Sequence, residues 1–477
     1  MSLREFPLPS LLALLVLSAC AANARAEDDQ VDPAFAATSN WGPGWDRLDF
    51  GSLDETAVAV ARSGDGGFIV CHSVPGGAAG ARIGLYKLDA RGRRLASGFG
   101  TSGHVLKDAF LSSVTDMTVD GSGRIIVVGN TPGPAGIEDF GVVRFLADGS
   151  DDPSFAGDGG TGDGFDDTSG AIDVFYRDRP MSVIAEPDGR IVVAGSVFAQ
   201  DDSDVRWGMI RFNADGSRDA RVAGRFAAGQ KAIGSRVLRI ADGHYVVAGS
   251  SLIAANDTDF GARIVAPGFT VDSGYSDAAT FAFDVPAGDG SIYDYLSDVA
   301  AVDPWTLVLA GVASTKTAVN RIRVLPGGGG APATLALDAG FVGGGVASFL
   351  HNYVSPLDIT GTNGAYGTAA TRVALRSDGS IVLSGRFKDT TEDRWYGIVT
   401  RLHADGTGDD AFGPLVPTQF YEAPTSAGPG SSDTGFADVL IDAGRPVLVG
   451  TSLDSLGDTD GVIMRLQSDL LFTDSFD

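Results

Sequence analysis

A recurring strand-and-turn unit is the feature that most constrains the fold of this chain. An alternating segment leads to a turn that usually contains Asp-Gly, and a short apolar segment that usually ends in glycine follows. The clearest copies are PDGRIVVAGS (Pro187–Ser196), ADGHYVVAGS (Ala241–Ser250) and SDGSIVLSGR (Ser377–Arg386). The apolar segments end at His72, Gly129, Gly195, Gly249, Gly311, Gly385 and Gly450, at intervals of 57, 66, 54, 62, 74 and 65 residues. The chain therefore contains seven related units.

A second segment follows each of these ends at a nearly fixed distance. Its glycines lie 12, 12, 13, 12, 12 and 11 residues after the matching ends, at Gly84, Gly141, Gly208, Gly261, Gly397 and Gly461. The fifth unit differs, because Ala318 stands only 7 residues after Gly311. We expect this unit to be degenerate or to carry a shortened hairpin.

The segments have the composition of strands. RIVVAGS and FIVCHS are short, rich in β-branched and aromatic residues, and bounded by turn residues, which is typical of buried strands. Asp-Gly pairs are hairpin signals, since glycine tolerates positive φ and the aspartate carboxylate accepts hydrogen bonds from the backbone of the same turn. Helical periodicity is absent after the N-terminal segment, so the sequence predicts an all-β fold.

The repeat resembles the delta-60 repeat family of bacterial proteins, whose units read roughly "DGKIVVAG…DFAVVRYNADGSLDxxFG". The resemblance depends on three pairs of segments: Asp188–Gly195 with Trp207–Ser217, Gly123–Gly129 with Phe140–Ser150, and Asp378–Gly385 with Tyr396–Thr407. It extends from about residue 31 to 469. Its motifs are turns and strands, so it implies a propeller-like architecture and no catalytic residues.

We expect a seven-bladed β-propeller of four-stranded antiparallel blades, because a ring of sheets protects edges that an open array exposes. A D-x-x-F turn follows the glycine-containing segment in several units, and it also occurs at Asp32–Phe35, before the first unit. The last unit lacks its fourth strand. We therefore expect the N-terminal strand near Trp45–Phe50 to pair with the strand near Gly461–Leu466 and to close the ring.

The N-terminus has the features of an export signal, which places the protein in the periplasm, on the outer membrane or outside the cell. Residues 1–26 contain Arg4, an apolar run at Leu11–Leu17 and small residues. Cleavage after Ala26 and a lipoprotein signal with lipidation at Cys20 are alternatives. Residues 27–469 then form one propeller domain, and residues 470–477 form a short tail similar to a sorting tail of some exported proteins.

Composition excludes some partners. The net charge of −26 disfavours nucleic acid and anionic membrane surfaces, so membrane contact is expected only through an N-terminal lipid. Cys71 is the one cysteine beyond Cys20, so the domain has no internal disulfide. We expect a monomer that is stabilised by its core, with Cys71 as a small buried side chain.

No catalytic motif stands out. The five histidines lack zinc-ligand spacing, and no G-x-S-x-G sequence is present. We expect no cofactor, with calcium as an alternative at the acidic stretch Asp158–Asp167. The ADGS-type turns at Asp148, Asp215 and Asp405 are explained by turn chemistry.

The stretched units between Gly249 and Gly385 contain the candidate ligand-binding residues. Tyrosine in long loops offers contact surface for a glycan or a protein ligand. The candidates are Tyr275, Tyr293, Tyr295, His351, Tyr353 and Tyr366. The first functional hypothesis is a non-enzymatic binding or scaffold propeller. The alternatives are a carbohydrate-active lyase or glycosidase that uses the central funnel, and a calcium-stabilised adhesin-like module.

Overall fold

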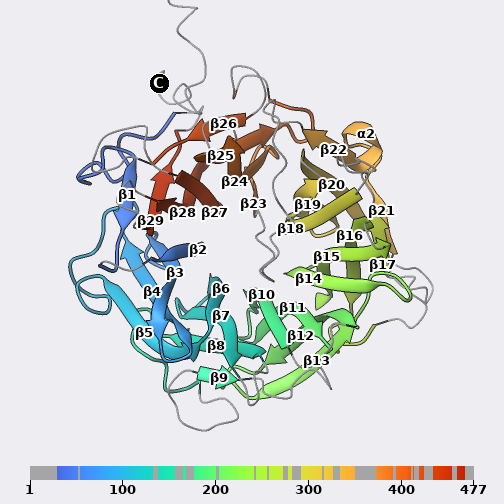
Figure 1. The fold of residues 1–477 in the computed structure, drawn as a ribbon, viewed down its shortest axis with the longest axis horizontal. Helices are drawn as coiled ribbons and strands as arrows, with labels where there is room; N and C mark the ends of the chain where they lie inside the picture. The colour runs from blue at the N-terminus through green and yellow to red at the C-terminus, as the bar shows by residue number, and fades with distance from the viewer. Residues whose placement is uncertain are drawn as a thin grey trace, which may run out of the picture.

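Short antiparallel strands make up nearly all of the regular structure, and they are arranged as a ring around a central axis (Figure 1). The computed structural model describes residues 30–467, with gaps at 52–53, 133–137, 156–164, 168–176, 200–202, 241–242, 255–256, 272–277, 282–291, 314–315, 326–333, 350–371, 390–393, 410–411, 413–417, 424–432 and 454–458. Within these residues the helical structure is one four-residue turn, α2 (Val342–Gly345). The predicted all-β class is confirmed.

Hydrogen bonding groups the strands into sheets of four, eight, nine, four and four strands. The first sheet along the chain contains β2 (Thr56–Arg62), β3 (Phe68–Gly77), β4 (Gly80–Leu88) and β5 (His104–Leu111). The eight-stranded sheet contains β6 (Ser113–Val119), β7 (Ile125–Pro132), β8 (Glu138–Phe145), β9 (Phe165–Asp167), β10 (Arg177–Ala185), β11 (Ile191–Phe198), β12 (Val205–Phe212) and β13 (Arg218–Gly224).

The nine-stranded sheet contains β14 (Lys231–Arg239), β15 (Tyr245–Ala254), β16 (Asp257–Val265), β17 (Ala278–Phe281), β18 (Ile292–Asp303), β19 (Thr306–Ala313), β20 (Lys316–Leu325), β21 (Thr334–Leu337) and β22 (Val346–Phe349). The next sheet contains β23 (Arg372–Leu375), β24 (Ile381–Asp389), β25 (Arg394–Leu402) and β26 (Thr418–Tyr421). The last contains β27 (Asp433–Asp442), β28 (Arg445–Leu453), β29 (Thr459–Arg465) and β1 (Trp45–Leu48).

The two large sheets differ from the predicted four-stranded units for a local reason. β8 and β10 are joined by a parallel pairing at Arg177 and Glu138. β16 and β18 are joined in the same way, where Ile292 and Tyr293 pair with Asp257 and Thr258. All other pairings in these sheets are antiparallel, so each large sheet consists of two antiparallel units. The units touch at the start of β10 and of β18, which are inner strands. The inner strands are the first strands of the units and lie nearest the centre of the ring: β2, β6, β10, β14, β18, β23 and β27 (Figure 1).

The turns form as the Asp-Gly signals predict. Between β10 and β11, the Glu186 N–H donates to the Arg190 carbonyl over 2.8 Å, and Gly189 has a φ of 90°. Glycine adopts this left-handed conformation without steric cost. The fifth unit has the shortened hairpin, since β19 and β20 pair with Gly311 opposite Ala318.

A steric requirement explains why most of the apolar segments end in glycine. Six of the seven inner strands contain a bulge, and the described part of β23 does not. In five of these six strands, the carbonyl before the bulge approaches the glycine of the neighbouring strand. A Cβ on Gly195 would overlap the carbonyl oxygen of Arg179, and one on Gly249 would overlap that of Ile233. The repeat therefore requires glycine where the second strand passes the bulge.

The cores lie between neighbouring sheets. All eight residues of β11 and of β19 are buried, as expected for strands covered on both faces. One apolar cluster brings together Phe35, Leu48, Phe68, Val447 and Ile463, from both ends of the chain. Stacking of adjacent sheets therefore provides the burial that a single unit lacks.

The predicted pairing between the two ends of the chain is confirmed. β1 runs antiparallel to β29, with Trp45 opposite Met464 and Leu48 opposite Gly461. The N–H of Asp32 also donates to the Arg465 carbonyl over 2.7 Å. The N-terminal segment thus supplies the fourth strand of the last sheet (Figure 1).

The D-x-x-F turns explain why this segment fits. In each turn the phenylalanine N–H donates to the aspartate carbonyl, and an arginine from the preceding strand pairs with the aspartate while its guanidinium lies over the ring. The sets are Arg144–Asp152–Phe155, Arg321–Asp338–Phe341, Arg401–Asp409–Phe412 and Arg465–Asp32–Phe35. The last set is assembled from opposite ends of the chain.

Candidate functional site

A cleft of about 460 Å³ opens where the last sheet meets its two neighbours in the ring. Its walls come from β24, β25, β27, β28 and β29 and from the first residue of β2. The lining residues are Thr56, Arg386, Trp395, Asp433, Thr434, Gly435, Phe436, Ala437, Thr451, Leu453 and Thr459. The cleft lies at the end of the ring where the inner strands β2 and β27 begin.

Arg386 departs from the repeat. The residue after the segment-ending position is Ser73, Asn130, Ser196, Ser250, Val312 or Thr451 in the other units. Four of these side chains hydrogen-bond to the next inner strand: Ser73 to Val114, Asn130 to Asp178, Ser196 to Gly234, and Ser250 to Leu296. In the sixth unit an arginine occupies this position, so a long cation replaces a short hydrogen-bonding side chain.

The space for this arginine comes from Gly435 on β27. A Cβ at Gly435 would lie 3.2 Å from both Cβ and Cδ of Arg386. The aliphatic part of the arginine therefore runs along the glycine backbone of the neighbouring sheet. Its guanidinium reaches Trp395, with the central carbon 4.6 Å from the ring centroid, a distance typical of a cation–π contact.

Among the described residues, no carboxylate pairs with Arg386. Its Nε is buried without a hydrogen-bond partner, and burial lowers the pKa of its guanidinium with no neighbouring acid to offset the effect. A partly buried cation without a counter-charge is unfavourable in a folded protein. Within the part of the chain that the structure describes, this positive charge in the cleft has no carboxylate paired with it.

The cleft also has a polar wall, and two of its side chains already accept hydrogen bonds from backbone N–H groups. The Asp433 carboxylate accepts a hydrogen bond from the backbone N–H of Trp395 over 2.9 Å, which holds the start of β25 against β27. Thr434 is buried and accepts a hydrogen bond from the Ala423 N–H. Thr56, Thr451 and Thr459 add hydroxyl groups from three other strands, and each of these hydroxyls can donate and accept.

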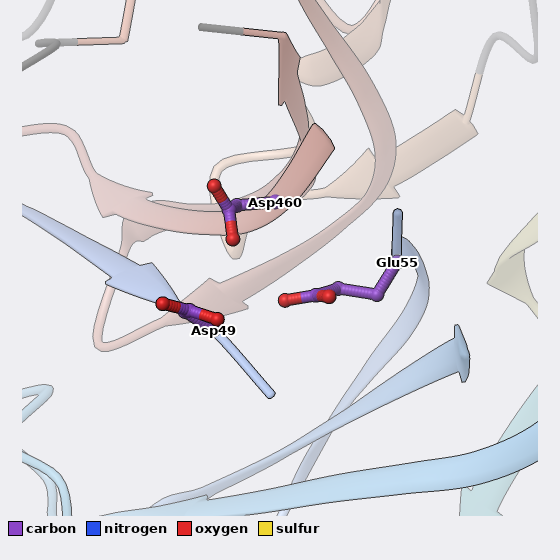
Figure 2. Close-up of side chains that lie close together, drawn as sticks. All are labelled: Asp49, Glu55 and Asp460. Atoms are coloured by element: carbon purple, nitrogen blue, oxygen red, sulfur yellow. The ribbon is translucent and has the colours of Figure 1, made fainter. Parts of the chain in front are cut away.

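A second polar cluster lies where the N-terminal strand joins the last and first sheets. Oxygen atoms of Asp49, Glu55 and Asp460 all lie within 4.8 Å of one another, and Figure 2 shows the three carboxylates facing a common centre. Glu55 accepts a hydrogen bond from the Phe50 N–H over 3.0 Å. Arg47 forms an ion pair with Asp460 and supplies positive charge. The cluster connects β1, β29 and the start of β2.

A third group, the axial cluster, consists of Asp116, Arg236, Asp298, Arg372 and Asp438, which come from different inner strands. Arg236 on β14 contacts Asp116 on β6 over 3.2 Å and Asp298 on β18 over 3.0 Å. β10 lies between β6 and β14 in the ring (Figure 1), so the contact between Arg236 and Asp116 joins strands that are not neighbours. The side chains of the axial cluster are 9% to 20% exposed.

The aspartates of the axial cluster also bind backbone groups of other inner strands. Asp116 accepts from the Val183 N–H over 3.0 Å, and Asp298 accepts from the Val373 N–H over 2.9 Å. Asp438 accepts from the Val60 N–H over 2.8 Å. The axial carboxylates therefore connect successive inner strands.

Burial raises the pKa of each axial carboxyl. The pKa of Asp438 is raised to about 7 and that of Asp298 to about 6, mainly because the charged form is poorly solvated. The negative charge of Asp116 adds to the effect on Asp438, and Arg236 opposes it. Asp438 therefore exchanges a proton near neutral pH.

Two of the predicted ligand-binding residues are brought together. Tyr293 and Tyr295 lie near the start of β18, both half-buried, with ring centroids 6.0 Å apart and planes at 14°. Tyr275, His351, Tyr353 and Tyr366 lie outside the described residues, as does Cys20. The two tyrosines do not line the cleft around Arg386.

The other sequence predictions concern single side chains. In the turns at Asp148, Asp215 and Asp405, the carboxylate accepts from the backbone N–H and the hydroxyl two residues later, as turn chemistry predicts. Cys71 is buried, and burial raises the pKa of its thiol. The side chains of the acidic stretch at 158–167 lie outside the described residues.

Comparison with known proteins identifies the fold. Residues 121–155, 186–221 and 376–412 match a family described as "Domain of unknown function (DUF5122) beta-propeller". A comparison with curated proteins found no significant match. No helix in the described part of the chain is long and apolar enough to cross a membrane.

Solved structures of similar shape have little sequence in common with this chain. A protein of unknown function from Dyadobacter fermentans is 12% identical, with a TM-score of 0.44, over 89% of this chain and 100% of its own. The β-propeller domain of the Trilobed protease from Pyrococcus furiosus is 10% identical, with a TM-score of 0.39, over 88% and 99%. The polysaccharide lyase Uly1 is 11% identical, with a TM-score of 0.44, over 86% and 89%. The chain has a β-propeller fold.

Proposed function

We propose that this protein is an exported, non-enzymatic binding propeller that holds an anionic ligand in the cleft around Arg386. The observation that carries the proposal is a partly buried guanidinium, at a position of the repeat where the other units have short side chains, that lacks a counter-charge among the described residues. A residue that breaks the pattern shared by the other units is expected to lie at a functional site. A bound anion would supply the missing charge.

The proposal includes the architecture that positions the cleft. The antiparallel units count as seven blades when each large sheet is divided at its parallel junction. The cleft then lies between blades six and seven, and the first strand of blade one completes its rim. A ring closed by β1 holds these three blades in fixed positions.

Binding to a mixed panel of anionic and neutral oligosaccharides and peptides tests this function. The variant Arg386→Gln should lose binding to the anionic members, whereas Arg91→Gln should retain it. Arg91 is exposed and does not line the cleft, so it controls for the loss of one positive charge. Equal binding by both variants would contradict the proposed site.

Export belongs to the same proposal and has its own test. Residues 1–26 act as the signal, or Cys20 is lipidated after a shorter one. In the lipidated case the protein partitions into detergent, and Cys20→Ser abolishes that behaviour. A mature N-terminus at Glu27 in mass spectrometry would support cleavage without a lipid.

An enzyme that works at the ring axis is the second candidate. Asp438 favours it, because a carboxyl whose pKa is raised to about 7 can act as a general acid or base. Both of its oxygens, however, accept backbone N–H groups, from Val60 and Val439. Release of reducing or unsaturated ends from acidic oligosaccharides, lost in Asp438→Asn, would support the enzyme.

A further inference from the structure

We infer that the Arg386 cleft recognises the carboxylate of a hydroxyl-rich ring, that is, a uronic acid residue of a carbohydrate. This inference rests on the proposed function and specifies its ligand class. It is based on the charge inside the cleft, the groups that line it and its size.

The charge in the cleft favours a single negative charge on the ligand. Among the described lining residues Arg386 is the one cation, and Asp433 contributes a carboxylate to the same wall. A ligand group with two negative charges, such as a phosphate monoester, would meet one guanidinium and an opposing carboxylate. A carboxylate has one charge at neutral pH, and its planar pair of oxygens matches the planar guanidinium.

The rest of the wall favours hydroxyl groups as neighbours of that carboxylate. Thr56, Thr451 and Thr459 come from β2, β28 and β29, and all three are exposed or half-buried. Threonine hydroxyls both donate and accept, which matches the hydroxyls of a sugar ring. An acidic peptide would instead present an aliphatic side chain to this wall.

The size and the apolar contacts agree with a short ligand segment. A volume of about 460 Å³ lies within the range of small-ligand pockets, roughly 300–1,000 Å³. Trp395 and Leu453 provide apolar surface in the lining, and Leu453 is 37% exposed. Such surfaces pack against the C–H groups of a sugar ring while its polar groups bind elsewhere.

The decisive experiment is calorimetric titration of the purified protein with four probes. These are an oligogalacturonate, its fully methyl-esterified form, a sulfated oligosaccharide that has no carboxylate groups, and a glutamate-rich peptide. The methyl ester keeps nearly all hydroxyls of the oligogalacturonate and removes its charge. We expect the oligogalacturonate to bind at least about tenfold more tightly than its ester, and Arg386→Gln to remove that difference.

Each outcome has a distinct meaning. Binding of the sulfated sugar or the peptide in an Arg386-dependent manner, without binding of the oligogalacturonate, would overturn the uronate class and leave the proposed function standing. Oligogalacturonate binding that Arg386→Gln does not change would place the ligand elsewhere. Failure of every anionic probe to bind would contradict both. Circular dichroism and melting curves of Arg386→Gln show whether a loss reflects the site or the fold.

Discussion

The guanidinium of Arg465 donates to the carboxylate of Asp32, which lies 433 residues earlier in the chain, over a distance of 2.9 Å. Both side chains are nearly inaccessible, at 3% and 8% exposure. The same arrangement is local in another unit, where Arg144 pairs with Asp152 only eight residues away. The pair that joins the chain ends has two further partners, since Arg465 also contacts Asp442 and Asp32 also accepts from Arg445. Both pairs belong to the same Arg–Asp–Phe arrangement but close loops of very different length, so they form a useful comparison.

Asp32→Asn should therefore differ from Asp152→Asn in its effect on the N-terminal strand. Each variant removes a carboxylate that pairs with a buried arginine and should lose up to about 3–5 kcal/mol of stability, although Arg465 keeps its contact with Asp442. Only Asp32→Asn weakens the attachment of the N-terminal strand. We expect limited proteolysis to cleave within residues 30–50 in Asp32→Asn and not in Asp152→Asn. The same cleavage pattern in both variants would contradict a closing role for this pair.

Deleting residues 27–53 should expose the edge of β29 and cause aggregation, because β1 covers that edge by backbone pairing. Light scattering and sedimentation of the refolded protein measure the effect. A synthetic peptide of residues 30–51, added during refolding, should restore solubility, and a scrambled peptide should not. A deletion variant that stays soluble and equally stable would show that the strand is dispensable.

Much of the architecture could be predicted from the sequence, because its causes are local. The Asp-Gly turns, the alternating strands and the D-x-x-F motif each depend on a few adjacent residues, and the motif at Asp32 indicated which strand the N-terminus completes. The sheet boundaries were less predictable. Parallel contacts such as Arg177 with Glu138 depend on how neighbouring units meet.

The candidate site was harder to predict, because it depends on side chains from separate units. Tyr293 and Tyr295 were selected for aromatic content in stretched repeats, and they stack on each other away from the cleft. Arg386 has a sequence signal of its own: it is the charged residue at a position that is small or β-branched in the other units. The aspartates of the axial cluster lie at bulges, which the recurring glycine marks, but the contacts between them depend on how the strands are arranged around the ring.

Gly461→Ala should destabilise the junction between the first and last sheets. A Cβ at this position would collide with the imidazole of His72 and lie 3.2 Å from the Leu48 carbonyl oxygen. His72 is fully buried and packs against Phe50, so it has little room to move. We expect a loss of about 1–3 kcal/mol in chemical denaturation. Gly121→Ala, where a Cβ meets nothing within 4 Å, should be nearly neutral.

The axial cluster predicts how stability changes with pH. The pKa of Asp438 is raised to about 7 in the folded protein, from an ordinary value of 3.8, so the folded state holds a proton that the unfolded state releases. This contribution favours folding below about pH 4 and is lost as the pH rises toward 7. Asp116, Arg236 and Arg372 face the same carboxyl.

Asp438→Asn removes this titration. Relative to the wild type, the variant should gain about 4 kcal/mol of stability between pH 4 and pH 7.5, since each pKa unit corresponds to about 1.4 kcal/mol and the pKa of Asp438 rises from 3.8 to about 7. Urea denaturation at several pH values measures the difference. Asp303→Asn, at an exposed position, should show no such slope. A parallel pH dependence for Asp438→Asn and the wild type would mean that Asp438 is ionised throughout this range.

The fourth strand of the last sheet, β1, comes from the other end of the chain, and this determines when the fold can be completed. A polypeptide that is emerging from the ribosome or the export machinery makes its N-terminal strand first, but the partner strand β29 (Thr459–Arg465) is among the last segments to arrive. Until then, β1 and the arginine-binding turn at Asp32 have nothing to pair with. Products of interrupted synthesis therefore keep an open edge that proteases and chaperones recognise, and only chains that extend to residue 465 or beyond can reach the protected state.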